Sequence, residues 1–137
     1  VKLDTNGTNP EMLMNLLKQK LVDYIAMDIK APLQKERYGK AAGTKADLAK
    51  IKRSIAMIKN SGVDYEFRST IVPGIHAKED ILRMARDIAP ARAYFLQSFR
   101  PEKTLNPKFE KIKPHPKHFL LEIKKEIQNL FQICGAR

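Results

Sequence analysis

Charged side chains stand within or just after the segments that the sequence predicts to be β-strands. Asp4 closes the first such segment, and Asp28 and Lys30 close the second. Arg68 lies inside the third segment, and Arg100 follows the fourth. In parallel α/β proteins the carboxyl ends of the strands gather at one edge of the sheet, where ligands bind. Two carboxylates, a lysine and two arginines at such an edge would suit a zwitterionic ligand with a carboxylate and an amine.

The charges of these residues constrain their arrangement. Asp4 and Asp28 would lie on neighbouring strands about 4.8 Å apart. Like charges at that separation need a cation between them, or a raised pKa in one carboxyl group. Asp28 and Lys30 are two residues apart, so they point to the same side of an extended strand. Arg68 lies in an apolar strand, where an unpaired guanidinium is costly, so it must pair with a structural carboxylate or with a ligand.

Two of these residues also have an ordinary structural interpretation. Asp4 precedes the pair Asn6-Gly7, so its carboxylate could simply be hydrogen-bonded within that turn. Lys30 comes shortly before Pro32 and could be a solvated loop lysine. Taken one at a time, therefore, these residues do not establish a binding site.

The segments that must position these residues alternate between strand and helix patterns. Strands are expected over five segments: 1–5, 22–29, 65–72, 93–99 and 131–134. Helices are expected where apolar residues recur at helical spacing: from Asn9-Pro10 to Leu17, from Thr44 as N-cap to Asn60, over 78–89, and from Phe119 to Leu130. Strict alternation with short connections predicts the α/β class, with right-handed crossovers and a parallel sheet. Four such βα units amount to about half of a closed barrel.

Composition narrows the class of protein. The 137 residues are 43% hydrophobic and 30% charged, which is typical of one folded domain and not of a disordered chain. No apolar run could cross a bilayer and no signal-peptide pattern opens the chain, so we expect a cytoplasmic protein. A single cysteine, Cys134, excludes an internal disulfide and cannot alone hold an iron–sulfur cluster. The net charge of +11 favours acidic partners.

Four short blocks resemble those of one enzyme family, in the same order and at compatible spacing. They are LDTNG at 3–7, AMDIK at 26–30, FRSTIVPG at 67–74 and LQSFRPE at 96–102. Together they resemble the C-terminal part of a radical S-adenosylmethionine activating enzyme. The resemblance is to the anaerobic ribonucleoside-triphosphate reductase activating proteins and the related pyruvate formate-lyase activating enzymes, and residues 97–107 favour the reductase type. It covers essentially the whole chain.

The resemblance implies a partial (β/α)6 TIM-like barrel that holds S-adenosylmethionine and a [4Fe-4S] cluster. In such enzymes the reduced cluster cleaves S-adenosylmethionine to a 5′-deoxyadenosyl radical. The radical takes a hydrogen from a glycine of the partner, a glycyl-radical enzyme. Carried over by motif, Asp28, Ile29 and Lys30 would border the cofactor. Asp4 and Thr5, together with Asp28, would match a site for a monovalent cation.

Two arginines complete the expected cofactor site. Arg68 would reach the carboxylate or ribose of S-adenosylmethionine, and Arg100 stands where the pyruvate formate-lyase type has a histidine. The family's C-x-x-x-C-x-x-C motif and its Gly-Gly-Glu segment, which normally precede the first strand here, are absent. We therefore expect residues 1–137 to be the C-terminal portion of a radical S-adenosylmethionine domain without its cluster-binding half. Such a chain would be inactive alone and would have neither cofactor bound.

Two other functions and one assembly remain open on the sequence. A basic module could bind nucleic acid or an acidic protein through a lysine-rich loop containing Lys103, Lys108, Lys111 and Lys113. A half-barrel aldolase could use Lys30 as a Schiff-base nucleophile. Half a barrel would also leave a strand edge and part of a sheet face uncovered, which predicts a homodimer.

Overall fold

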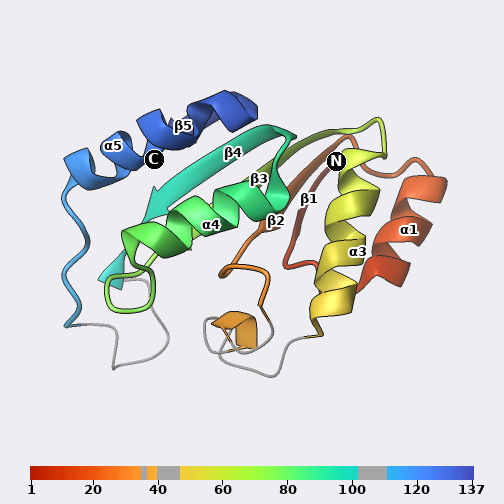
Figure 1. Cartoon of the computed structure of the whole chain (residues 1–137). Helices are drawn as coiled ribbons and strands as arrows, with labels where there is room; N and C mark the ends of the chain where they lie inside the picture. The colour runs from red at the N-terminus through yellow and green to blue at the C-terminus, as the bar shows by residue number, and fades with distance from the viewer. Residues whose placement is uncertain (35–36, 40–46, 102–110) are drawn as a thin grey trace.

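The computed structural model of the chain describes residues 1–34, 37–39, 47–101 and 111–137 (Figure 1). Its strands are β1 (Lys2–Thr5), β2 (Tyr24–Asp28), β3 (Asp64–Ile71), β4 (Ala91–Ser98) and β5 (Phe131–Ala136). Its helices are α1 (Pro10–Lys18), α3 (Leu48–Lys59), α4 (Lys78–Ile88) and α5 (Lys117–Ile127), followed by the 3-10 turn η3 (Gln128–Leu130). The predicted order of strands and helices is confirmed, with boundaries shifted by a few residues.

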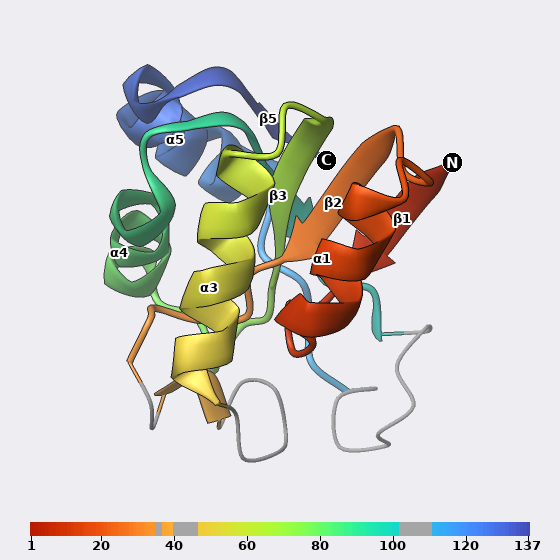
Figure 2. The ribbon, with the colours of Figure 1, turned by 90° about the vertical axis from the view of Figure 1, so that its right-hand side faces the viewer.

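All five strands form one parallel sheet in the order β1-β2-β3-β4-β5. Because every connection leads to the next strand in the same direction, right-handed crossovers place the helices on one face. Figures 1 and 2 show α1, α3, α4 and α5 gathered along that face. The predicted α/β class with alternating βα units is confirmed. In the described residues β1 and β5 are the edges of the sheet, so barrel closure is not observed.

The hydrophobic core lies between the sheet and this helical layer. From the sheet it takes Ile25, Met27, Phe67 and Tyr94, all completely buried. From the helices it takes apolar residues at helical spacing, such as Leu13 of α1, Ile51 and Ile58 of α3, Ile81 and Ile88 of α4, and Ile123 and Ile127 of α5. The apolar stripes in the sequence therefore predicted which side of each helix faces the sheet.

Of two N-caps predicted from the sequence, one is confirmed and the other is wrong. Asn9 caps α1 as predicted, because its side-chain oxygen accepts a hydrogen bond from the backbone N–H of Met12 at 3.1 Å. The predicted Thr44 cap of α3 is wrong. The N-cap is Asp47, whose carboxylate accepts from the backbone of Ala49 and Lys50, and a carboxylate there also interacts favourably with the helix dipole. Thr44 itself lies outside the described residues.

The other face of the sheet has no helix over it in the part of the chain that the structure describes (Figure 2). Alternation along the strands places Phe67 and Ser69 towards the helices, and Glu66 and Arg68 on this helix-free face. The helix-free face contains Asp4, Asp28 and Arg68, three of the charged residues that the sequence analysis placed in or just after predicted strands. The sheet therefore separates an apolar core from a charged surface.

Candidate functional site

The guanidinium of Arg68 lies between two carboxylates on the helix-free face. Its Nε donates to Oδ1 of Asp28 at 2.7 Å, and its Nη2 lies 3.6 Å from Oδ1 of Asp4. The strand register explains the arrangement, because Asp28 is paired with Arg68 and Asp4 is paired with Ala26, two residues before Asp28. The cation that two neighbouring carboxylates require is thus supplied by the next strand.

Arg68 is the least exposed member of this charged cluster, with 17% of its side chain exposed against 31% for Asp28 and 61% for Asp4. Burial acts to lower the pKa of Arg68. Its hydrogen bond to Asp28 and the charges of Asp28 and Asp4 outweigh burial and raise that pKa. Arg68 therefore stays charged, and Asp28 presents a carboxylate that is already partly neutralised.

Lys30 belongs to the same cluster. Its Nζ lies 3.7 Å from Oδ2 of Asp28, so the second carboxylate oxygen faces the ammonium while the first accepts from Arg68. Asp28 is thus shared between two cations, and 41% of the Lys30 side chain remains exposed. An ammonium held loosely at 3.7 Å can turn towards an anionic ligand group more readily than the hydrogen-bonded Arg68.

Thr5 and Arg100 do not join this cluster. The Thr5 hydroxyl accepts a hydrogen bond from the backbone N–H of Gly7 at 3.0 Å, and Thr5 alternates with Asp4, so its side chain faces the helices. Arg100 is exposed just after β4, and no hydrogen bond or ion pair joins it to Asp4, Asp28 or Arg68 in the described residues. The part of Thr5 in a site for a monovalent cation stays a prediction.

The backbone from Asp28 to Lys30 is held by side chains from outside β2. The hydroxyl of Tyr38 accepts from the N–H of Lys30 at 3.2 Å and lies 3.5 Å from the carbonyl oxygen of Asp28. Ser69 Oγ donates to the carbonyl of Ile29 at 2.7 Å. The ring of His76 lies 2.7 Å from the carbonyl oxygen of Lys30. Ile29 itself is buried, so this segment offers a fixed backbone with its flanking charges facing outwards.

A second charged group on the helix-free face was missed by the sequence analysis. Glu66 is only 4% exposed although no helix covers this face. Its carboxylate accepts from the hydroxyl of Tyr24 at 2.8 Å and from Nη1 of Arg137 at 3.1 Å. The guanidinium of Arg137 lies 3.8 Å from the centre of the Phe95 ring, so the side chain of the residue just after β5 crosses β4 to reach β3.

A signal for Glu66 was present in the sequence. It precedes Arg68 by two residues in the predicted strand, so the two side chains had to share one face. Burial and the hydrogen bond and charge of Glu66 raise the pKa of Tyr24 to about 12. Its partners Tyr24 and Arg137 come from segments that are distant in sequence, and periodicity does not reveal such contacts.

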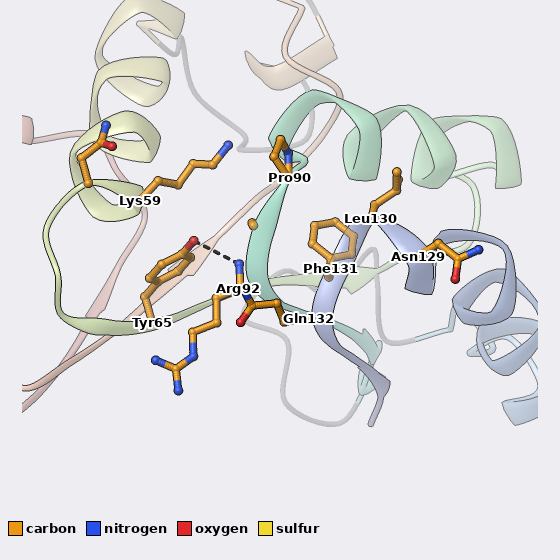
Figure 3. Close-up of a pocket in the computed structure, with 10 residues that line it drawn as sticks. Lys59, Tyr65, Pro90, Arg92, Asn129, Leu130, Phe131 and Gln132 are labelled. Carbon is orange, nitrogen blue, oxygen red and sulfur yellow. Dashed lines mark hydrogen bonds between the residues drawn. The ribbon is translucent and has the colours of Figure 1, made fainter.

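A cavity of about 510 Å³ opens at the opposite end of the sheet, near the amino ends of β3, β4 and β5 (Figure 3). Its two cationic lining residues already have partners. Lys59 Nζ donates to the carbonyl of Ile88 at 2.9 Å, and Arg92 pairs with Asp64. Tyr65 accepts from the backbone N–H of Arg92 at 3.0 Å. The cavity is therefore a poorer candidate than the carboxyl-end cluster for an anionic ligand.

Comparison with known proteins gives one informative match. No protein-family model matches the chain. The chain is 37% identical over 121 residues to a protein of Methanocaldococcus jannaschii named "putative glycyl-radical enzyme activating enzyme". This similarity supports the assignment of the chain to the family of glycyl-radical enzyme activating enzymes. The match covers 85% of this chain but only about half, 49%, of the relative, and it does not distinguish the reductase type from the pyruvate formate-lyase type.

The donor groups fit one implied cofactor and not the other. The carboxylates and cations around Asp28 have the charges that a zwitterionic sulfonium such as S-adenosylmethionine requires. A [4Fe-4S] cluster does not fit these 137 residues, because they contain one cysteine, and burial raises the pKa of the Cys134 thiol. Among the described residues no group of three His, Cys, Asp or Glu side chains could hold a metal ion.

Within the same residues no helix has the length and apolar character needed to cross a membrane.

Proposed function

We propose that this chain forms the S-adenosylmethionine-binding part of an activating enzyme for a glycyl-radical enzyme. The observation that carries the proposal is the cluster of Asp28, Lys30, Arg68 and Asp4 at the carboxyl ends of adjacent parallel strands. This is the edge at which α/β proteins bind ligands. The 37% identity to a relative with an activating-enzyme name supports the same assignment.

The residues have distinct proposed roles towards S-adenosylmethionine. Lys30 binds its carboxylate, because the Lys30 ammonium is half-exposed and is held only at 3.7 Å from Asp28. The carboxylate of Asp28 accepts from the cofactor's amino group, and Arg68 holds Asp28 in place or contacts the ribose. The buried Ile29 fixes the backbone between the two charges. Arg100, which follows β4, is proposed on the family resemblance alone to approach the bound cofactor.

The proposed site for a monovalent cation uses the carboxylates of Asp4 and Asp28 with the backbone carbonyl of Thr5. Arg68 now neutralises both carboxylates, so a bound cation would compete with its guanidinium. An ion that binds there would weaken the contact between Arg68 and Asp4 first, because that pair is 3.6 Å apart and Asp4 is the more exposed carboxylate. Potassium and sodium titrations monitored at the Arg68 side chain by NMR test this site.

The thiolates of the cluster are proposed to come from outside these 137 residues. The bound cluster and S-adenosylmethionine would supply the radical chemistry of the whole protein, and the residues described here would bind and orient the cofactor. The strands would then belong to a larger, barrel-like sheet, and the partner would be a glycyl-radical enzyme. In that assembly the helix-free face is the inner one, so the homodimer expected from uncovered strand edges would form only in the absence of the rest of the barrel.

The activity is tested on the native gene product, purified without oxygen from its source cell. Its intact mass and peptide map are compared with residues 1–137, and its iron and sulfide contents are measured. The expected result is a longer polypeptide with clustered cysteines that releases 5′-deoxyadenosine from S-adenosylmethionine under reducing conditions. A product that starts at Val1, or one that binds iron but forms no 5′-deoxyadenosine, would contradict the proposal.

A further inference from the structure

His76 connects the segment after β3 to the segment after β2. It is 6% exposed, and both of its ring nitrogens have backbone partners. The N–H of Val72 donates to Nδ1 at 2.9 Å, and Nε2 lies 2.7 Å from the carbonyl oxygen of Lys30. Because a backbone N–H can only donate, Nδ1 must accept. The proton of the neutral ring is therefore on Nε2, which donates to Lys30.

The carbonyl of Lys30 lies beyond the paired part of the sheet. The register of β2 with β3 ends at Asp28 and Arg68, and the N–H of Ile29 makes one further bond to the carbonyl of Arg68 at 2.8 Å. Tyr38 holds the N–H of Lys30, and His76 holds its carbonyl. Two side chains thus replace the strand ladder at the residue whose ammonium faces Asp28.

Burial and the neighbouring charges oppose protonation of the His76 ring. Burial lowers the pKa of His76, and nearby Arg37 and His115 lower it further, whereas its two backbone hydrogen bonds raise it. Arg37 comes from the short segment after β2 and pairs with Asp80 of α4, which also accepts from the N–H of Ala77 at 2.9 Å. His115 precedes α5 and stacks on Phe119. A proton on Nδ1 would also place two donors, Nδ1–H and the N–H of Val72, against each other.

We propose that His76 is a positioning residue for Lys30. The neutral ring accepts from Val72 at Nδ1 and donates from Nε2 to the Lys30 carbonyl, so that the Lys30 ammonium stays beside Asp28. Protonation of Nδ1 removes the bond to Val72. The proposal rests on the function proposed above, because it assigns to His76 the control of the same cofactor site. It adds a pH-sensitive contact 46 residues away from Lys30 in the sequence.

Two substitutions separate the two hydrogen bonds of the ring. In His76→Gln the side-chain amide N–H can reach the position of Nε2 and donate to Lys30, but nothing accepts from Val72. In His76→Asn the shorter side chain can accept from Val72, but it does not reach Lys30. We expect His76→Gln to keep the affinity for S-adenosylmethionine and His76→Asn to weaken it about ten-fold, the effect of one lost hydrogen bond at the site.

The assay is calorimetric titration of S-adenosylmethionine into the native gene product with its cluster in place and into both variants of it, with thermal unfolding measured in parallel. If both variants lower only the unfolding temperature and bind equally well, His76 is merely structural and the proposal is overturned. Equal weakening by both variants would also overturn it, because the bond to Lys30 would then have no special part.

An NMR measurement separates failure of this proposal from failure of the proposed function. The nitrogen chemical shifts of the His76 ring report its tautomer without any cofactor. We expect the Nε2–H tautomer near neutral pH, with the Ile29 and Lys30 amide signals shifting as the ring titrates. The wild-type protein could bind no S-adenosylmethionine and still show Lys30 signals that shift with the titration of His76. The proposed function would then be wrong, and the proposed contact between His76 and Lys30 would stand. An Nδ1–H tautomer, or a titration that leaves Lys30 unmoved, overturns the connection itself.

Discussion

Arg68 and Asp28 occupy paired positions on adjacent parallel strands, and the Nε of Arg68 donates to Oδ1 of Asp28 at 2.7 Å. This contact satisfies two electrostatic requirements that were evident from the sequence. A guanidinium inside an apolar strand needs a carboxylate, and two carboxylates at neighbouring strand ends need a cation. Asp28 retains a second oxygen that faces Lys30, so the pair remains able to bind a ligand.

Removal of the Arg68 guanidinium should destabilise the fold in a salt-dependent way. In Arg68→Leu, Asp28 and Asp4 lose their shared cation, and we expect a loss of about 1 kcal/mol in the free energy of unfolding at neutral pH, since the cluster is partly screened by solvent. Urea unfolding measures this value. The loss should shrink in high salt, which screens the ion pairs between partly exposed charges. An equal loss at low and high salt would contradict the account.

Glu66 should control the ionisation of Tyr24. Its hydrogen bond and its charge are, after burial, the causes that raise the pKa of Tyr24 to about 12, so Glu66→Gln should move that pKa towards 10. A raised pKa of an acid stabilises the fold below pH 10, and the stabilisation is lost as the pH rises towards 12. NMR of the ring carbon that bears the hydroxyl measures the change. An unchanged titration of Tyr24 would show that burial alone raises its pKa.

The stability of the fold should decline in mild acid because of His76. Its pKa lies below the usual 6.5, so the neutral ring stabilises the fold above pH 6.5, and this contribution is lost as the pH falls through the lowered pKa. His76→Gln has no ring to titrate and should lose less stability over that range. Chemical unfolding of both proteins at several pH values below 7 tests this difference. Parallel pH profiles would mean that other groups cause the decline.

Gly7 and Gly62 form a matched pair for a test of close packing. Both have a positive φ, +77° and +76° respectively, so alanine is strained at either site. A Cβ on Gly7 would also collide with the Sδ–Cε end of Met27, whereas one on Gly62 would meet nothing within 4 Å. Gly7→Ala should therefore cost about 1–3 kcal/mol more than Gly62→Ala. Equal losses would indicate that Met27 moves away freely.

The sequence predicted those parts of the structure that depend on local pattern. Strand and helix order followed from periodicity, and the Asn9 cap followed from its residue type and the adjacent Pro10. The cost of an isolated charge predicted that Arg68 has a partner, a carboxylate or a ligand, and the structure shows the carboxylates of Asp28 and Asp4. The Thr44 cap failed because several polar residues precede α3, and residue type alone does not choose among them.

Long-range contacts explain what the sequence did not predict. The ring of His76 reaches the carbonyl of Lys30, and Arg137 crosses Phe95 to reach Glu66. Such contacts depend on strand register and on loop conformation, which one sequence does not specify. Lys103 and Lys108 of the alternative basic surface lie outside the described residues, while Lys111 and Lys113 are exposed.

The most direct test of the central claim is calorimetric titration of S-adenosylmethionine into the native gene product, with its iron–sulfur cluster in place, and into two matched variants of it. Asp28→Asn removes the shared carboxylate at the site. Glu126→Gln removes an exposed carboxylate that pairs with Lys78 on the helical side, and it serves as the control. We predict binding by the wild-type protein and the control, and affinity at least about ten-fold weaker in Asp28→Asn. No binding by the wild-type protein with its cluster in place, or equal binding by all three proteins, would contradict the assignment of Asp28 and its neighbours to the cofactor.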